Sequence, residues 1–220
     1  MAKINHWGAL ATAAGLLAAV GLLVVLYAQP AEATFPGKPG KIAYDSSDGN
    51  DSEIYTIKSG GGGKKQLTDN GTGDYEPSYS PSGKQIVYSS RDAPNGDYEL
   101  YTIKSGGGGK KQLTDNSTAD FEPSYSPSGK KIVYAGEDGP NGDYEIYTIN
   151  AGGGSKFNVT DNGADDYYSS YSPSGKKIAY QGEDGANGDY EVYTINAGGG
   201  SKFRVTDNNT GDYTPSWGSS

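Results

Sequence analysis

Short apolar runs alternate with polar turns along most of this chain. A run such as Lys131-Ile132-Val133-Tyr134-Ala135 is rich in β-branched and aromatic residues and is followed by a turn rich in Gly, Asp and Asn. Between residues 121 and 166 the pattern predicts short strands at 121–126, 131–135, 144–149 and 156–160. The Asn141-Gly142 pair supplies the positive φ that a tight hairpin needs between the second and third of them. We therefore predict an all-β fold of short antiparallel strands.

The strand pattern recurs with a period of 46 residues. Its anchor, Pro-Ser-Gly-Lys, begins at Pro81, Pro127 and Pro173. Four strands in a period of roughly 40–50 residues are typical of one blade of a β-propeller. The sequence therefore predicts a β-propeller of four four-stranded blades over residues 39–218, with blade units at 39–80, 81–126, 127–172 and 173–218.

The two ends of the repeat region complement each other. The first unit starts at a second strand, Lys41 to Tyr44, and the segment from Asp212 to Trp217 resembles a first strand. Pairing of the two would interlock the N- and C-terminal strands and close the ring without an open edge. The same strands could instead pair between chains, giving a larger ring of two chains or a filament. Both closures remain open at this stage.

The N-terminus has the pattern of an export signal. Lys3 and His6 precede an apolar run from Trp7 to Ala28, and Ala31-Glu32-Ala33 has the small residues that a signal peptidase accepts. We predict a signal peptide at 1–33 followed by a linker at 34–38. An uncleaved anchor is the alternative, because a membrane span needs about 20 apolar residues. In both cases the repeats are expected to be secreted, periplasmic or on the cell surface.

Composition and charge argue against two classes of function, nucleic-acid binding and catalysis. The net charge of −9 argues against nucleic acid as a partner, because phosphates require a basic patch. The chain has no Cys, and His6 is its single His, so nucleophilic catalysis assisted by a basic side chain lacks its usual residues. We predict a protein that is not an enzyme. Chemistry on sugars by paired carboxylates is a distant alternative.

Three repeated words carry a resemblance to a known family: Pro-Ser-Tyr-Ser-Pro-Ser-Gly-Lys, Glu-Ile-Tyr-Thr-Ile and Gln-Leu-Thr-Asp. They resemble the WD-like repeats of TolB-type β-propellers throughout residues 39–218. The family's usual Trp is kept at Trp217 and replaced at Tyr79, Tyr125 and Tyr171. The resemblance implies a propeller fold at the cell envelope. Similar propellers precede prolyl-oligopeptidase-type hydrolase domains, but no Gly-x-Ser-x-Gly motif with such a domain follows here.

The hairpins between second and third strands carry carboxylates and amides at alternate positions. Calcium prefers such oxygen ligands from one flexible turn. A structural role is the alternative, because Asp and Asn cap turns and the Glu begins the next strand. The candidate calcium ligands are Asp92, Asn95, Asp97 and Glu99; Asp138, Asn141, Asp143 and Glu145; and Asp184, Asn187, Asp189 and Glu191.

A second carboxylate set, with an aromatic residue after each member, precedes the innermost strands. Because those strands line the channel of a propeller, we predict a ring of carboxylates at one mouth, which either holds a cation or is hydrated. The aromatic residues are candidates for stacking against a peptide or sugar, with packing inside the fold as the alternative. The carboxylates are Asp74, Asp120, Asp166 and Asp212, and the aromatic residues are Tyr75, Phe121, Tyr167 and Tyr213.

These features together predict an exported binding or scaffold module without catalytic activity. Its ligand is expected to be a protein, a peptide or a glycan, and contact with a membrane is expected only through an uncleaved N-terminal segment. The alternative is a self-assembling surface or filament protein that depends on Ca²⁺. Any specific contact is expected to begin at the few positions that break the repeat, which are Arg91, Asp165, Tyr168, Ser169 and Arg204.

Overall fold

The computed structural model describes residues 40–47, 49–139, 142–184 and 188–218. Their regular secondary structure consists of β-strands. Within this part of the chain no helix is long and apolar enough to cross a membrane. The predicted signal peptide or anchor and the predicted linker lie outside the described residues.

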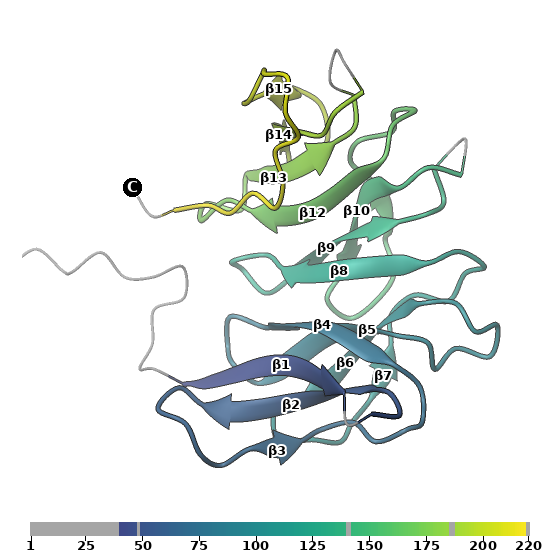
Figure 1. Ribbon diagram of the computed structural model, residues 1–220, viewed down its shortest axis with the longest axis vertical. Helices are drawn as coiled ribbons and strands as arrows, with labels where there is room; N and C mark the ends of the chain where they lie inside the picture. Colours follow the sequence, from purple (N-terminus) through teal and green to yellow (C-terminus); the bar gives the residue numbers. More distant parts are fainter. Residues whose placement is uncertain (1–39, 48, 140–141, 185–187, 219–220) are drawn as a thin grey trace, which may run out of the picture. The chain divides into compact units, whose positions relative to one another are not determined.

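The strands form four antiparallel sheets, each a consecutive piece of the chain. Figure 1 shows the sheets following one another in chain order. The first sheet contains β1 (Lys41–Ser47), β2 (Ser52–Lys58) and β3 (Lys65–Gln66). The other three have four strands each: β4 (Asp74–Tyr79), β5 (Gln85–Ser90), β6 (Glu99–Lys104) and β7 (Lys111–Gln112); β8 (Asp120–Tyr125), β9 (Lys131–Gly136), β10 (Glu145–Asn150) and β11 (Phe157–Asn158); and β12 (Asp166–Tyr171), β13 (Lys177–Gly182), β14 (Glu191–Asn196) and β15 (Phe203–Arg204).

The predicted all-β propeller with four blades is confirmed. The first three predicted strands of the representative unit differ from β8, β9 and β10 by one residue at most. The outer strand, β11, is shorter than predicted. A side chain replaces one backbone partner at this edge of β10. Ile146 donates its N–H to Thr160 Oγ1 at 2.9 Å rather than to a backbone carbonyl.

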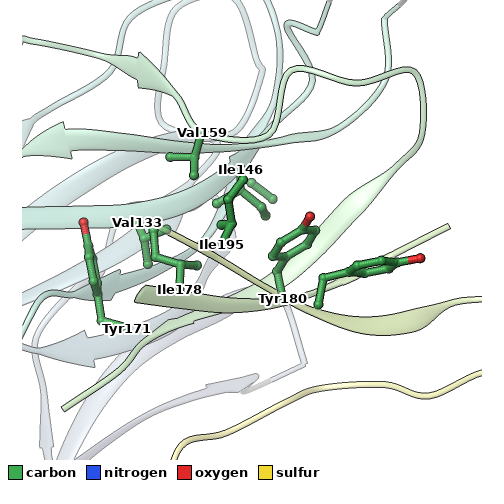
Figure 2. Close-up of a cluster of buried hydrophobic side chains, with 9 residues drawn as sticks. Val133, Ile146, Val159, Tyr171, Ile178, Tyr180 and Ile195 are labelled. Carbon is green, nitrogen blue, oxygen red and sulfur yellow. The ribbon is translucent and has the colours of Figure 1, made fainter. Parts of the chain in front are cut away.

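Apolar residues from neighbouring blades meet at each junction. Figure 2 shows the junction between the third and fourth blades, where Val133, Ile146 and Val159 of the third pack with Ile178 and Tyr180 of the fourth. The other junctions repeat the arrangement, with Leu100 beside Ile132 and Ile54 beside Ile86 in the equivalent clusters. Complete burial of one such side chain stabilises the fold by roughly 1.5–3 kcal/mol.

Pairs of Tyr rings from second and third strands stack within each blade. The rings of Tyr134 and Tyr147 are 5.7 Å apart, and the ammonium group of Lys156 lies 4.2 Å from the centre of the Tyr147 ring. The same Lys also forms an ion pair with Asp138. Equivalent stacks occur at Tyr44–Tyr55, Tyr88–Tyr101 and Tyr180–Tyr193.

The predicted interlocking of N- and C-terminal strands is not found among the described residues. β1 has β2 as its strand partner, and its sheet has three strands. The segment Asp212–Trp217 runs along β12 and β13 instead (Figure 1). It is held there because Asp212 donates its N–H to the carbonyl of Tyr190 at 2.7 Å, and Trp217 Nε1 donates to the carbonyl of Ser170 at 3.1 Å. These contacts place the segment beside the fourth blade rather than the first.

Candidate functional site

Each of the inner strands β4, β8 and β12 is interrupted by a β-bulge. The first bulge residue of each strand has positive φ although it is not Gly, at 55° for Glu76, 56° for Glu122 and 52° for Tyr168. Thr214 has the same conformation at 51°. Such a conformation costs on the order of 1 kcal/mol or more, so the surrounding structure must compensate for it. Its recurrence makes it a regular feature of the inner strands.

The bulge frees a backbone N–H from the strand pairing, and the preceding blade supplies an acceptor for it. Glu76 Oε2 accepts a hydrogen bond from the N–H of Glu122 at 2.7 Å. In turn, Glu122 Oε2 accepts one from the N–H of Tyr168 at 2.6 Å. Gln181 does the same for Thr214 at 3.0 Å. We call this series of side-chain acceptors the bulge ladder.

A pocket of about 330 Å³ opens along the bulge ladder. Burial raises the pKa of Glu122 to about 7, the hydrogen bond from Tyr168 acts in the opposite direction, and the charge of Glu76 adds to the rise. Tyr168 is 45% exposed. We call this site the inner-strand pocket; it is lined by Glu76, Pro77, Ser78, Glu122, Pro123, Ser124, Tyr168, Ser169, Ser170, Thr214 and Pro215.

The four aromatic residues predicted to bind a ligand lie in one continuous series of ring contacts. Three Tyr residues that precede the third strands alternate with them, and neighbouring ring centres are 4.7–6.3 Å apart. Tyr213, at the end of the series, is 60% exposed, whereas the other six rings are partly buried. We call this series the aromatic belt; in order it contains Tyr75, Tyr98, Phe121, Tyr144, Tyr167, Tyr190 and Tyr213.

The belt adjoins the inner-strand pocket through Glu76, which also lines a second cavity of about 330 Å³ with Asp45, Tyr75, Tyr98 and Phe121. The alternate Tyr residues are not among the site residues predicted from the sequence. A signal was present, because the word Asp-Tyr-Glu recurs before the third strands at the 46-residue period. Ligand binding by the belt stays a prediction.

The second carboxylate set does not line the inner-strand pocket. Asp74, Asp120 and Asp166 are completely buried, and Asp120 receives a hydrogen bond at 3.1 Å from the side-chain amide of Asn116. Its Oδ1 lies against Gly136 of β9, only 2.7 Å from where a Cβ would be. The carboxylate therefore points against its own blade, which explains why no ring forms around the inner-strand pocket.

Burial raises the pKa of carboxyl groups in this set. Burial raises the pKa of Asp120 to about 7, against an opposing effect of Lys156. It raises the pKa of Asp166 to about 8, against the hydrogen bond from Asn162. The fourth member, Asp212, is partly exposed and accepts a hydrogen bond from the side-chain amide of Asn208 at 2.6 Å. Cation binding by this set stays a prediction.

The hairpin residues predicted to bind Ca²⁺ have other partners. Ion pairs join Lys110 to Asp92, Lys156 to Asp138 and Lys202 to Asp184. The three Glu residues turn inwards and each accepts a backbone N–H from the loop after the fourth strand, at Asn116, Asn162 and Asn208.

All residues of the second-blade hairpin are described, and its candidate ligands have different surroundings. Asn95 donates its side-chain amide to the carbonyl of Asn116, Asp97 is half-buried, and Glu99 is buried. No group of three carboxylates that could hold a metal occurs in the described parts of the chain. Asn141 and Asn187 lie outside the described residues. Calcium binding stays a prediction.

Two of the positions that break the repeat lie in the inner-strand pocket. Tyr168 and Ser169 occupy the positions that hold Glu and Pro in the preceding two blades. The others lie elsewhere: Arg91 stacks on Tyr98 at 5.2 Å, Asp165 accepts the N–H of Tyr144 at 2.9 Å, and Arg204 pairs with Glu191 at 3.0 Å.

The chain is similar in structure to a putative TolB from Agrobacterium tumefaciens, with 24% identity and a TM-score of 0.67 over 76% of this chain and 61% of that one. It is also similar to TolB from Acinetobacter baumannii, with 27% identity and a TM-score of 0.66 over 79% of this chain and 42% of that one. The chain thus spans about three fifths and two fifths of these structures.

A more distant likeness, to hydrazine synthase from Kuenenia stuttgartiensis, concerns the fold alone. Its identity is 15% and its TM-score 0.63, over 80% of this chain and 33% of that one. The comparison with curated proteins gives no match. The family model of the TolB beta propeller domain matches residues 30–139, which is half of the sequence. The chain belongs to the TolB beta propeller domain family.

Proposed function

We propose that this chain is an exported, non-catalytic binding module whose inner-strand pocket receives a basic segment of a partner protein. The observation that carries the proposal is the composition of that pocket. Equivalent bulge positions from successive blades meet there and place two carboxylates, those of Glu76 and Glu122, beside proline faces and an exposed Tyr.

The chemistry of the pocket favours a cationic ligand. The carboxylates of Glu76 and Glu122 are complementary to Lys and Arg, and opposite charges guide partners to each other and fix their register. Pro77, Pro123 and Tyr168 offer apolar surface to the aliphatic parts of such side chains. The net charge of −9 also attracts a basic partner over a longer distance.

Several observations support a role without catalysis. Each of the two pocket Glu residues uses one carboxylate oxygen to hold a backbone N–H of the next blade, which is a bracing role. The single His of the sequence, His6, lies in the segment predicted to be an export signal, and there is no Cys. A nucleophile activated by His, or a thiolate nucleophile, therefore has no residues to form it.

Export is supported by the order of features at the N-terminus. A Lys, a long apolar run and a small-residue site precede the propeller, which is the order found in secretory signals. Fractionation of cells that express the full chain tests this part of the proposal. Recovery of the protein from the cytoplasm would contradict it.

The binding test uses fluorescein-labelled peptides of equal length in which Tyr alternates with Lys, Arg, Ser or Glu. Fluorescence anisotropy should show that the Lys and Arg peptides bind and that the Glu peptide does not. The double variant Glu76→Gln/Glu122→Gln should weaken this binding at least tenfold. The matched control is Asp115→Asn, which removes an exposed carboxylate outside both cavities and should bind as the wild type does. Equal binding of all peptides, or unchanged binding by the double variant, would refute the proposal.

A further inference from the structure

The first and fourth blades each leave uncovered an apolar position that is buried or partly buried at the internal junctions. Ile42 on β1 is 52% exposed, whereas its repeat equivalents Ile86, Ile132 and Ile178 are completely buried. The second strand of the first blade therefore has the residue that normally packs against a preceding blade. We call the side of the first blade that contains Ile42 and the edge of β1 the head face.

The fourth blade shows the same contrast on its opposite side. Val205 is 51% exposed, whereas its repeat equivalents Leu113 and Val159 are 9% and 4% exposed. Inside the chain, Val159 belongs to the same cluster as Ile178, Tyr180 and Tyr193 of the following blade (Figure 2). We call the side of the fourth blade that contains Val205 and the segment Asp212–Trp217 the tail face.

The segment on the tail face already has the conformation of an inner strand. Asp212 donates its N–H to Tyr190 in the same way as Asp166 does to Tyr144. Thr214 has the positive φ of the bulge residues, and its N–H is held by Gln181. Among the described residues no second strand is paired with this segment, and no inner strand is paired with β1.

The glycine hairpins give an independent indication. A side chain placed on Gly107, Gly153 or Gly199 would lie within 4 Å of the fourth strand of the preceding blade or of the residues that flank this strand. At Gly61, in the first blade, the same position has nothing within 4 Å. The head face therefore lacks its neighbour along the outer part of the blade as well as at β1.

We propose that the head face of one copy of this chain docks on the tail face of a second copy and reproduces an internal blade junction. The preformed segment Asp212–Trp217 then adds to β1 as an antiparallel inner strand, a form of β-strand addition. The occupant is a second copy because the apolar residues Ile42 and Val205 of the two faces match, as Ile and as Val or Leu, the residues on the two sides of each internal junction. Within one chain the side chains of Ile42 and Val205, one on each face, remain about half exposed.

The internal junctions define the register of this contact. Tyr171 pairs with Ile178 and Ser170 with Ala179 in the fourth blade, so Trp217 lies opposite Ile42 and Ser216 opposite Ala43. Asp212 then lies opposite Ser46, as Asp74 lies opposite Ser90, whose hydroxyl donates to that carboxylate. The interface is head-to-tail, so its repetition gives a closed ring or a filament according to the rotation between copies.

The test compares the solution mass of the full chain with that of two single variants, Ile42→Asp and Val205→Asp, by light scattering over a range of concentrations. The wild type should form species of at least twice the mass of one chain, and each variant alone should be monomeric. Because Ile42→Asp keeps an intact tail and Val205→Asp an intact head, an equimolar mixture should form a dimer containing one of each. Asp115→Asn, which changes an exposed carboxylate outside both cavities and away from both faces, is the control and should associate like the wild type.

Each outcome decides the question, because the substituted side chains are half exposed and the variants should melt like the wild type. A monomeric wild type would overturn the proposal, and so would variants that still associate, since another surface would then be responsible. Monomers in the mixture would also overturn it. Peptide binding to the inner-strand pocket is measured separately, so the loss of one property leaves the other testable.

Discussion

The carboxylate of Glu122 accepts a hydrogen bond at 2.6 Å from the backbone N–H of Tyr168, which lies 46 residues further along the chain and in the next blade. The bond connects two bulges and pairs the N–H of Tyr168, which would otherwise be an unpaired donor in the middle of an inner strand. Both bulge residues are in the left-handed region of φ. The bulge ladder thus couples an unfavourable backbone conformation to the attachment between blades.

Removal of the Glu122 acceptor should destabilise the protein. In Glu122→Ala the N–H of Tyr168 loses its partner, which costs roughly 0.5–1.5 kcal/mol of unfolding free energy because water in the open pocket replaces part of the bond. Glu122→Gln keeps an oxygen acceptor and should lose less than half as much. Urea unfolding measures both values. Equal stability of the Ala variant and the wild type would mean that the ladder contributes nothing to stability.

Stability should fall as the pH rises through neutrality. Burial raises the pKa of Asp120 to about 7 and that of Asp166 to about 8, from a usual value near 3.8. The folded state therefore holds these protons more tightly than the unfolded chain does. Their contribution is complete below about pH 4 and is lost as the pH rises through 7 and 8.

Thermal melting from pH 5 to pH 8.5 measures this loss. Each 1 kcal/mol shifts Tm by roughly 2–4 °C in a domain of this size, so we expect Tm to fall by roughly 5 °C or more. The variant Asp120→Asn/Asp166→Asn lacks both titrating groups and should show a flatter profile. A wild-type Tm that stays constant or rises over this range would contradict the assignment.

Gly136 should tolerate Ser better than Ala. A Cβ at this position lies 2.7 Å from Asp120 Oδ1 and 3.1 Å from the Tyr147 ring, so Gly136→Ala forces the carboxylate to move, at a cost of roughly 1–3 kcal/mol. In the second blade the equivalent residue is Ser90, and its hydroxyl donates to Asp74. Gly136→Ser should therefore regain part of the loss in denaturant unfolding. The reverse order of the two variants would show that steric fit alone governs the site.

Calcium binding at the hairpins, a prediction from the sequence, would have to compete with the Lys–Asp ion pairs. We expect weak binding, with Kd on the order of 10⁻⁴–10⁻³ M as in extracellular modules. Lys156→Gln frees Asp138 and should tighten binding several-fold, whereas Asp138→Asn should weaken it. Isothermal titration of the full chain with CaCl₂ measures all three. The absence of heat with both the wild type and Lys156→Gln would show that these hairpins are structural.

The 46-residue period was enough to predict the blades, because each strand repeats the same apolar word. It also identified the positions of Asp120 and Phe121, but it could not predict which way the side chains point. The bulge after Phe121 changes the alternation of faces in the strand, so Glu122 rather than Asp120 reaches the inner-strand pocket. A bulge leaves no separate mark in a sequence where Glu and Pro simply follow an aromatic residue.

The predicted pairing of the two ends is not found among the described residues, for a related reason. The word Asp-Tyr-Thr-Pro-Ser-Trp correctly indicated an inner strand, and Asp212–Trp217 has that conformation without a partner strand. The sequence shows that this segment and β1 are complementary. It gives no information on the rotation between neighbouring blades, and this rotation decides whether the segment and β1 meet within one chain.

The bulge ladder has one direction, since the acceptor lies in one blade and the donor in the next along the chain, from Glu76 to Glu122 and from Glu122 to Tyr168. A duplicated unit inserted between two blades would find matching partners on both sides without any new contact. Unequal recombination between such similar repeats can therefore add or remove blades one at a time. This architecture makes blade number a quantity that evolution can change in a single step, while the inner surface gains one more copy of the same bulge position.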